Sequence, residues 1–208
     1  MRHKDQGRRR AQLAAAARVV LLERGAVGLR VKDVAARAGL SPSSVLYYYP
    51  NIDDLLLEVT RAAMSRYAER RAEAVRSVEE GAIAQLRLAI HLGVPTGPDD
   101  EESRLLYELD GLTGASPLFA TLSASFFDRQ VMLYERILER GADAGAFTLA
   151  GGAEMLARGL VALEDGLGLQ VVLGHPGVDS DAAERILLTW AASITGAELE
   201  ISPGLTAR

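Results

Sequence analysis

The sequence predicts an all-α protein of about nine helices. Apolar residues recur every three or four positions in nearly every segment, whereas the alternation typical of strands is scarce. Gly and Pro residues separate these segments and mark the ends of successive helices. With 208 residues, 49% of them hydrophobic, the chain can bury one large core or two small ones.

Three helices are expected at the N-terminus. The first should end at Gly25 and the second at Gly39, because glycine suits a helix C-cap. Ser41 can cap the third, Pro42 suits its first position, and Pro50 prevents its continuation. The three helices are expected at residues 8–24, 31–38 and 42–48.

Six further helices are expected after these three. Asn51 can cap the first of them, and the stretches 93–100 and 141–147 are expected to form a loop and a turn. The tail from Glu198 is expected to be frayed. The helices are placed at residues 51–77, 79–92, 99–112, 116–141, 150–173 and 179–195. We therefore expect an N-terminal domain at 1–52 and a helical body at 53–208.

Charge is distributed unevenly along the chain. The net charge is −5, but the first 52 residues hold ten Lys and Arg against three Asp and Glu. The remaining residues hold 13 basic and 25 acidic side chains. A basic end on an acidic body is typical of a protein that meets phosphate at one end. A basic tail that only improves solubility is the alternative.

The sequence lacks the residues that several kinds of functional site require. The chain has no cysteine, so disulfides, zinc fingers and thiolate nucleophiles are excluded. Its three histidines have no metal-ligand spacing, and no phosphate-binding loop or hydrolase motif is present. We expect no enzyme and no cofactor or metal. Without a long apolar run or a signal peptide, we expect a cytoplasmic protein without membrane contact.

The segment 31–48 carries a helix-turn-helix pattern. Such a motif needs a small residue on its first helix, which Ala35 provides. Gly39 suits the left-handed turn, and Val45 can be buried between the two helices. The remaining apolar positions of the motif are Val34, Leu40 and Tyr48.

Residues 31–56, VKDVAARAGLSPSSVLYYYPNIDDLL, follow an expected first helix that ends in Glu23-Arg24-Gly25. This stretch resembles the DNA-binding domain of the TetR/AcrR family, and the resemblance covers about residues 8–60. It implies that the third helix enters the major groove of double-stranded DNA.

The resemblance, together with local chemistry, gives candidate DNA contacts. Ser43 and Ser44 are candidates for base contacts, and Tyr47 is expected near bases or phosphate. Ser41 is a candidate for a phosphate contact at the helix N-terminus. Phosphate or minor-groove contacts are expected from Arg8, Arg9, Arg10, Arg30 and Lys32. We expect Tyr48 and Tyr49 in the core.

Two positions depart from the family pattern. Leu46 replaces a tyrosine and Ile52 replaces a lysine, both of which contact DNA in the family. These two contacts are therefore not expected. Because short serine side chains discriminate bases poorly, DNA shape and Tyr47 should contribute to specificity.

The C-terminal half is similar to another part of the family. Residues 136–147 and 159–170 look like the C-terminal domain of the branch that includes betaine-pathway regulators. This similarity implies a homodimer in which the last two helices of each copy form a four-helix bundle; an ordinary monomer core is the alternative. The dimer candidates are Leu156, Leu163, Leu167, Ile186 and Trp190.

A small-molecule pocket is expected within the body. Core packing is the alternative for its aromatic candidates, and a helix-dipole contact is the alternative for His91. The acidic charge of the body would suit a cationic ligand. The candidates are His91, Tyr107, Phe126, Phe127, Gln130, Tyr134 and Asp165.

These observations and the resemblance together imply a DNA-binding transcriptional regulator. We expect a repressor that binds a near-palindromic operator and is released by a small-molecule effector. The alternative is a helical small-molecule-binding or interaction module that does not bind DNA.

Overall fold

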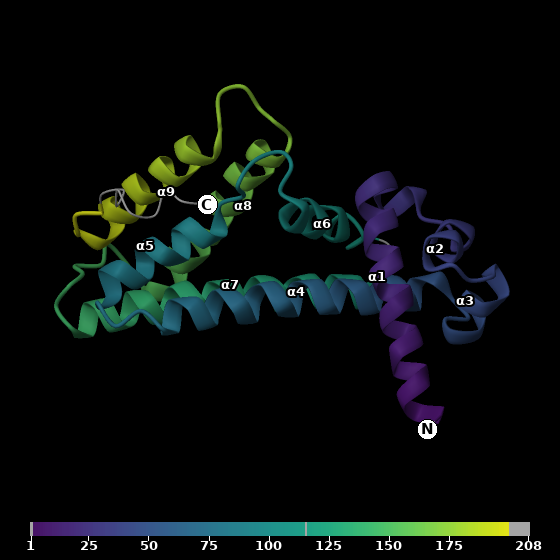
Figure 1. Ribbon diagram of the computed structural model, residues 1–208. Coiled ribbons are helices and arrows are strands. Elements are labelled where there is room, and N and C mark those ends of the chain that lie inside the picture. The colour runs from purple at the N-terminus through teal and green to yellow at the C-terminus, as the bar shows by residue number, and fades with distance from the viewer. Residues whose placement is uncertain (1, 115, 200–208) are drawn as a thin grey trace. The chain divides into compact units, whose positions relative to one another are not determined.

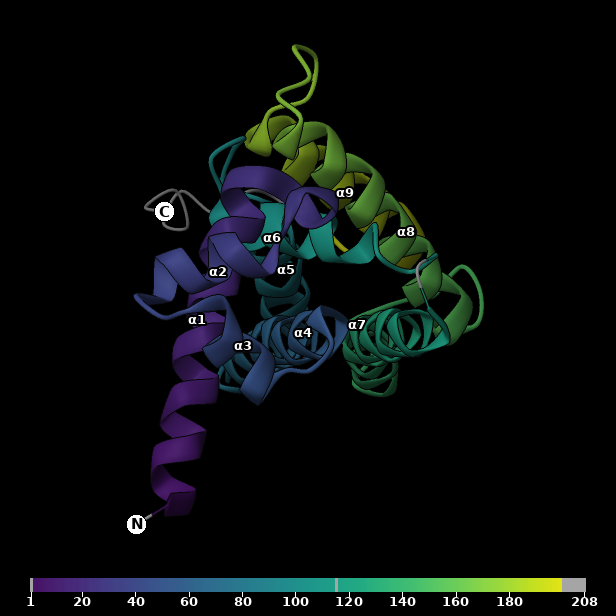
Figure 2. The same cartoon turned by 90° about the vertical axis from the view of Figure 1, so that its right-hand side faces the viewer.

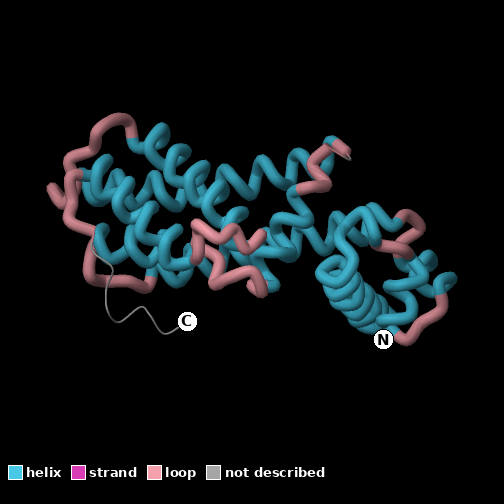
Figure 3. The backbone as a smooth tube through the Cα atoms, turned by 90° about the horizontal axis from the view of Figure 1, so that it is seen from above, coloured by secondary structure: helices cyan, strands magenta, loops and turns pink. Residues whose placement is uncertain are grey.

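The computed structural model describes residues 2–114 and 116–199, and within them it contains helices and no strand (Figures 1 and 3). The predicted all-α class is confirmed. The helices are α1 (Arg2–Gly28), α2 (Val31–Ala38), α3 (Pro42–Tyr48), α4 (Ile52–Arg76), α5 (Ala82–Gly93), α6 (Glu101–Asp110), α7 (Pro117–Asp143), α8 (Ala153–Val172) and α9 (Ser180–Thr195).

Most helix ends lie within two or three residues of their predicted positions. The main difference is α1, which begins at Arg2 rather than near residue 8. Gly25 interrupts it with φ 71°, as its left-handed preference predicts. The predicted frayed tail lies largely outside the described residues, although Leu199 within it is buried.

The chain forms two compact units. The first consists of Met1–Ser65 with Arg104–Ala124, and the second of Arg66–Ser103 with Ser125–Arg208. Helices α4, α6 and α7 contribute residues to both units. No helix in the described part of the chain is long and apolar enough to span a membrane.

In the first unit, α2 and α3 pack against each other and against α1 (Figure 1). Gly39 adopts φ 65° at the end of α2, and the Ser41 side chain accepts a hydrogen bond from the Ser44 amide at the start of α3. Val34, Ala35 and Val45 are buried between the helices. The predicted helix-turn-helix is therefore present, with its turn and cap residues in the expected roles.

In the second unit, α8 and α9 lie side by side and α5 packs against both (Figures 1 and 2). Their apolar faces meet in a core that also receives residues of α4 and α7. The α7–α8 connection is held by the Gly141 carbonyl, which accepts hydrogen bonds from the amides of Ala146 and Phe147.

We predict that Gly141→Ala destabilises the second unit by about 1–3 kcal/mol. An added Cβ atom would collide with the buried Phe147 ring. Gly152→Ala is the control, since a Cβ atom there meets nothing within 4 Å. Urea denaturation of both variants measures the effect, and equal stabilities would contradict this packing.

Candidate functional site

Helix α3 presents one face to solvent. Tyr47 is 73% exposed and Ser43 is exposed beside it, while Ser44 is half-buried. The Ser41 hydroxyl lies 2.9 Å from that of Ser43 and 2.8 Å from that of Ser44. The outer face of α3 therefore carries three clustered hydroxyl groups and one exposed phenol.

The neighbouring tyrosines have other roles. Tyr49 is buried and Tyr48 is partly buried against the core of the first unit, as predicted. The Tyr47 ring meets the edge of the Tyr48 ring, with centroids 5.1 Å apart. This contact orients Tyr47 while it remains exposed.

The predicted basic contacts divide into two groups. Arg10 lies over the Tyr49 ring at 4.7 Å, pairs with Glu58 at 3.3 Å and donates to the Tyr48 carbonyl. Arg30 donates to the carbonyl oxygens of Val27 and Leu29. Arg10 and Arg30 thus support the local structure.

The other basic candidates lie on the surface. Lys32, on the first turn of α2, is exposed, and so is Arg8. Arg9 is half-buried and donates to Gln12 at 2.8 Å.

The second unit contains a buried polar network centred on Arg71 of α4, a residue that is 1% exposed. Its guanidinium donates to both carboxylate oxygens of Glu164, at 2.8 and 2.6 Å. It also donates to Gln130, to the Tyr134 hydroxyl and to the Ala89 carbonyl. The Tyr134 hydroxyl in turn donates to Glu164.

The charge state of this network follows from its contacts. Burial alone would lower the pKa of Arg71, but the adjacent Glu164 carboxylate raises it well above its ordinary value. Burial and the Glu164 charge both raise the pKa of Tyr134, so its hydroxyl stays protonated and can donate. Burial also raises the pKa of Tyr67, which flanks Arg71, to about 12.

Gln130 and Tyr134, predicted to contact a ligand, therefore bind Arg71 and Glu164. Arg71 was missed by the sequence analysis. One signal was available: Tyr67, Arg71 and Val75 recur at intervals of four residues on the same side of α4. An arginine within an apolar stripe indicates a buried partner.

The other ligand candidates do not form one cluster. His91 pairs with Glu184 at 3.0 Å. Phe126 packs between Tyr67 and Phe127, with ring centroids 5.8 and 5.9 Å away. Asp165 is half-buried on α8, and Tyr107 belongs to the first unit.

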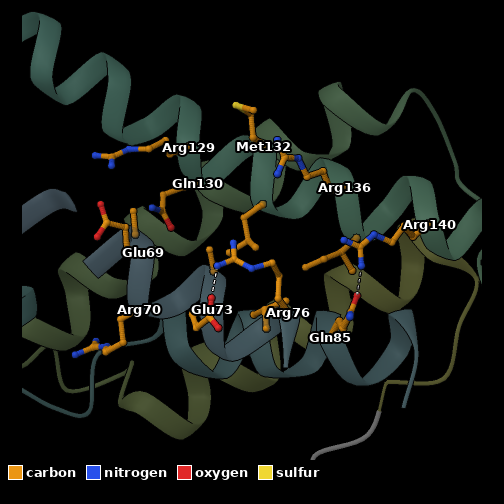
Figure 4. A pocket seen from close by; sticks show the side chains of 15 residues that line it. Glu69, Arg70, Glu73, Arg76, Gln85, Arg129, Gln130, Met132, Arg136 and Arg140 are labelled. Carbon is orange, nitrogen blue, oxygen red and sulfur yellow. Dashed lines mark hydrogen bonds and ion pairs between the residues drawn. The ribbon is translucent and has the colours of Figure 1, made fainter. Parts of the chain in front are cut away.

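A groove of about 670 Å³ opens between α4, α5 and α7 within the second unit (Figure 4). Its polar lining includes five arginines and two glutamates. Only one predicted ligand residue, Gln130, lines it. The arginines are Arg70, Arg76, Arg129, Arg136 and Arg140.

The dimer candidates occupy different environments. Leu156 and Leu167 are each 7% exposed and belong to the protomer core. Leu163 is partly buried, and Ile186 is 42% exposed. Trp190 packs against α8 so closely that a side chain at Gly159 would strike its ring.

Two family models match the sequence. Residues 13–59 match the bacterial regulatory proteins of the tetR family. Residues 82–196, more than half of the chain, match the C-terminal domain of BetI-type transcriptional repressors. The chain belongs to the TetR family, with a BetI-type C-terminal domain. It is accordingly a DNA-binding transcriptional regulator.

Two similar proteins match this chain over most of its length. The HTH-type transcriptional regulator PksA of Bacillus subtilis (strain 168) is 25% identical over 203 residues, 91% of each protein. A transcriptional regulator from Saccharomonospora viridis, solved in complex with choline, is 26% identical with a TM-score of 0.80. That match covers 87% of this chain and 94% of the other.

A third protein shares the fold at lower identity. A TetR transcription regulator from Haloarcula marismortui has a TM-score of 0.79 at 21% identity, covering 92% and 99% of the two chains.

We predict that Glu164→Ala lowers the free energy of unfolding by about 3–5 kcal/mol, because Arg71 would remain buried without its counter-charge. The double variant Arg71→Met/Glu164→Leu should lose less, since it buries no charge. Urea denaturation checks both.

Glu154→Ala is the control. Its carboxylate pairs with Arg158 at an exposed position, so the expected change is within about 0.5 kcal/mol. A loss for Glu164→Ala as small as that of the control would contradict the importance of the buried pair.

Proposed function

We propose that this regulator is a repressor that binds a near-palindromic operator as a homodimer and is released by a small-molecule effector. The main support for this proposal is the exposure of α3. Val45 on its inner face is buried, while Ser43 and Tyr47 on its outer face are exposed to solvent. A short helix held rigidly from behind, with polar groups in front, suits the major groove. Cytoplasmic, non-enzymatic action on DNA follows from this role.

The proposed DNA contacts have different functions. In this proposal Tyr47 and Ser43 would contact base edges, and Lys32 would contact a phosphate. Ser41 and Ser44 complete the hydroxyl cluster at the start of α3. The surface arginines Arg8 and Arg9 extend the basic face along α1.

An effector site in the second unit is supported by two observations. The similar S. viridis regulator was solved with choline, which supports small-molecule binding by proteins of this fold. The groove between α4, α5 and α7 has a volume within the range of ligand sites. Helix α4 lines this groove and begins directly after α3, so a ligand that shifts α4 would alter the DNA-binding unit.

The homodimer is proposed through the outward faces of α8 and α9. Ile186 and Trp190 lie one turn apart on α9, and Trp190 reaches Gly159 on α8. The buried Leu156 and Leu167 would instead support this surface from behind. The exposed α8 residues that share the Gly159 side are Met155, Ala162, Gly166 and Leu169, and Leu173 follows as the C-cap of the helix.

We predict that Tyr47→Ala reduces operator affinity about tenfold or more, with little effect on scrambled DNA, because it removes a base contact. Lys32→Ala should weaken binding to both DNAs and lower the salt dependence by about one phosphate contact. Fluorescence anisotropy across a salt series, with DNA from upstream of the gene, measures both variants.

Arg185→Ala, an exposed α9 variant, is the control and should bind both DNAs like the wild type. If neither Tyr47→Ala nor Lys32→Ala differed from this control, α3 would not be the reading helix.

We predict that Leu169→Arg/Ile186→Arg converts the dimer into monomers, because four charges would be buried per interface without partners. Sedimentation equilibrium gives the mass directly. Leu118→Arg, at an exposed apolar position of the first unit, is the control and should remain dimeric. A dimer that survived the double variant would place the interface elsewhere.

A further inference from the structure

The groove of the second unit has the opposite charge to its surroundings. Residues 53–208 carry 13 basic and 25 acidic side chains, yet the groove is lined by five arginines and only two glutamates. Two of the five arginines are already paired, Arg76 with Glu73 and Arg70 with Glu102. The positive charge left for a ligand is therefore that of the three α7 arginines. A local excess of positive charge on an acidic body creates a favourable potential for an anion.

Three of the arginines lie on α7 in one row. Arg129, Arg136 and Arg140 are separated by seven and four residues, so they share one side of the helix. Like charges at such spacing repel one another and slightly destabilise a helix. Over this row the groove extends roughly 16 Å, from a rise of about 1.5 Å per residue. Figure 4 shows Arg129 toward one end and Arg140, near Gln85, toward the other.

Two of these guanidinium groups retain unused donors. The Nε atom of Arg129 is buried and has no hydrogen-bond partner in the described structure. Arg136 is exposed at the groove and forms no ion pair with any residue that the structure describes. The exposed guanidinium of Arg136 can therefore donate to an anion in the groove. Arginine is also the side chain best suited to hold carboxylate or related groups by paired hydrogen bonds.

Apart from Gln85 and Gln130, the rest of the lining is apolar. Ala68, Ala72 and Val75 come from α4, and Leu133 and Ile137 come from α7. Met132 lies at the rim, where its flexible side chain can adapt to different shapes. An apolar wall between arginines matches a molecule with an apolar body and an anionic group.

We propose that this groove binds an amphipathic organic anion, with an acidic group held by Arg136 and Arg140 and an apolar body against Val75 and Ile137. This ligand class is opposite in charge to choline, with which the S. viridis regulator was solved. The role of this anion as the effector rests on the proposed repressor function. Its binding to the groove does not depend on that function.

The test uses two dyes that share one ring system. 8-Anilinonaphthalene-1-sulfonate carries an acidic group, and N-phenyl-1-naphthylamine is its neutral counterpart. Binding to the full-length protein without DNA is followed by dye fluorescence. We expect the anionic dye to bind at least about tenfold more tightly than the neutral one, as charge-assisted hydrogen bonds to arginine require.

Arg136→Gln/Arg140→Gln should weaken the anionic dye about ten- to a hundredfold and leave the neutral dye unchanged. Both side chains are exposed, so the variant should keep its fold, which circular dichroism verifies. Arg158→Gln/Arg185→Gln is the control, because it removes the same charge from exposed positions outside the groove.

No binding of the anionic dye, equal binding of both dyes, or equal losses in the two double variants would overturn the proposal. Operator binding by the free protein is measured separately. A protein that binds the anion but not DNA would refute the repressor and leave the site intact, and the reverse result would refute only the site.

Discussion

The second unit depends on one buried ion pair. Arg71 uses its guanidinium to join α4 to three other helices, and Glu164 supplies the charge that makes its burial tolerable. Gly93 leaves room for the pair, since a side chain there would strike both partners. Its further partners are Ala89 on α5 and Gln130 and Tyr134 on α7. Because hydrogen bonds are directional, the network restricts the register of these helices more than apolar packing alone would.

Helix α4 belongs to both units and also lines the groove. Near its start, Leu55 is buried in the helix-turn-helix core, and further along come Arg71 and the groove residue Arg76. A ligand that binds the groove would therefore act on the element that continues into the DNA-binding unit, provided its affinity differs between two positions of α4.

The groove shows why a family does not determine a ligand. The fold is shared with the choline-bound regulator from S. viridis, but binding chemistry depends on the side chains that line each site. The net acidity of the body pointed to a cationic ligand, whereas the lining of the groove points to an anion. Local charge prevails because interactions beyond roughly 8–10 Å are largely screened at physiological ionic strength.

The sequence by itself determined the helices, the helix-turn-helix and the family, because these depend on periodicity, caps and glycine conformation over a few residues. Gly39, Ser41 and Pro50 act on their own neighbours, so their effects are readable along the chain. Only the tertiary structure decided which polar residues meet. Arg71 and Glu164 are 93 positions apart, and the groove arginines come from two helices, α4 and α7. No local pattern could therefore show that Arg71 and Glu164 form a buried pair while the groove arginines line an open surface.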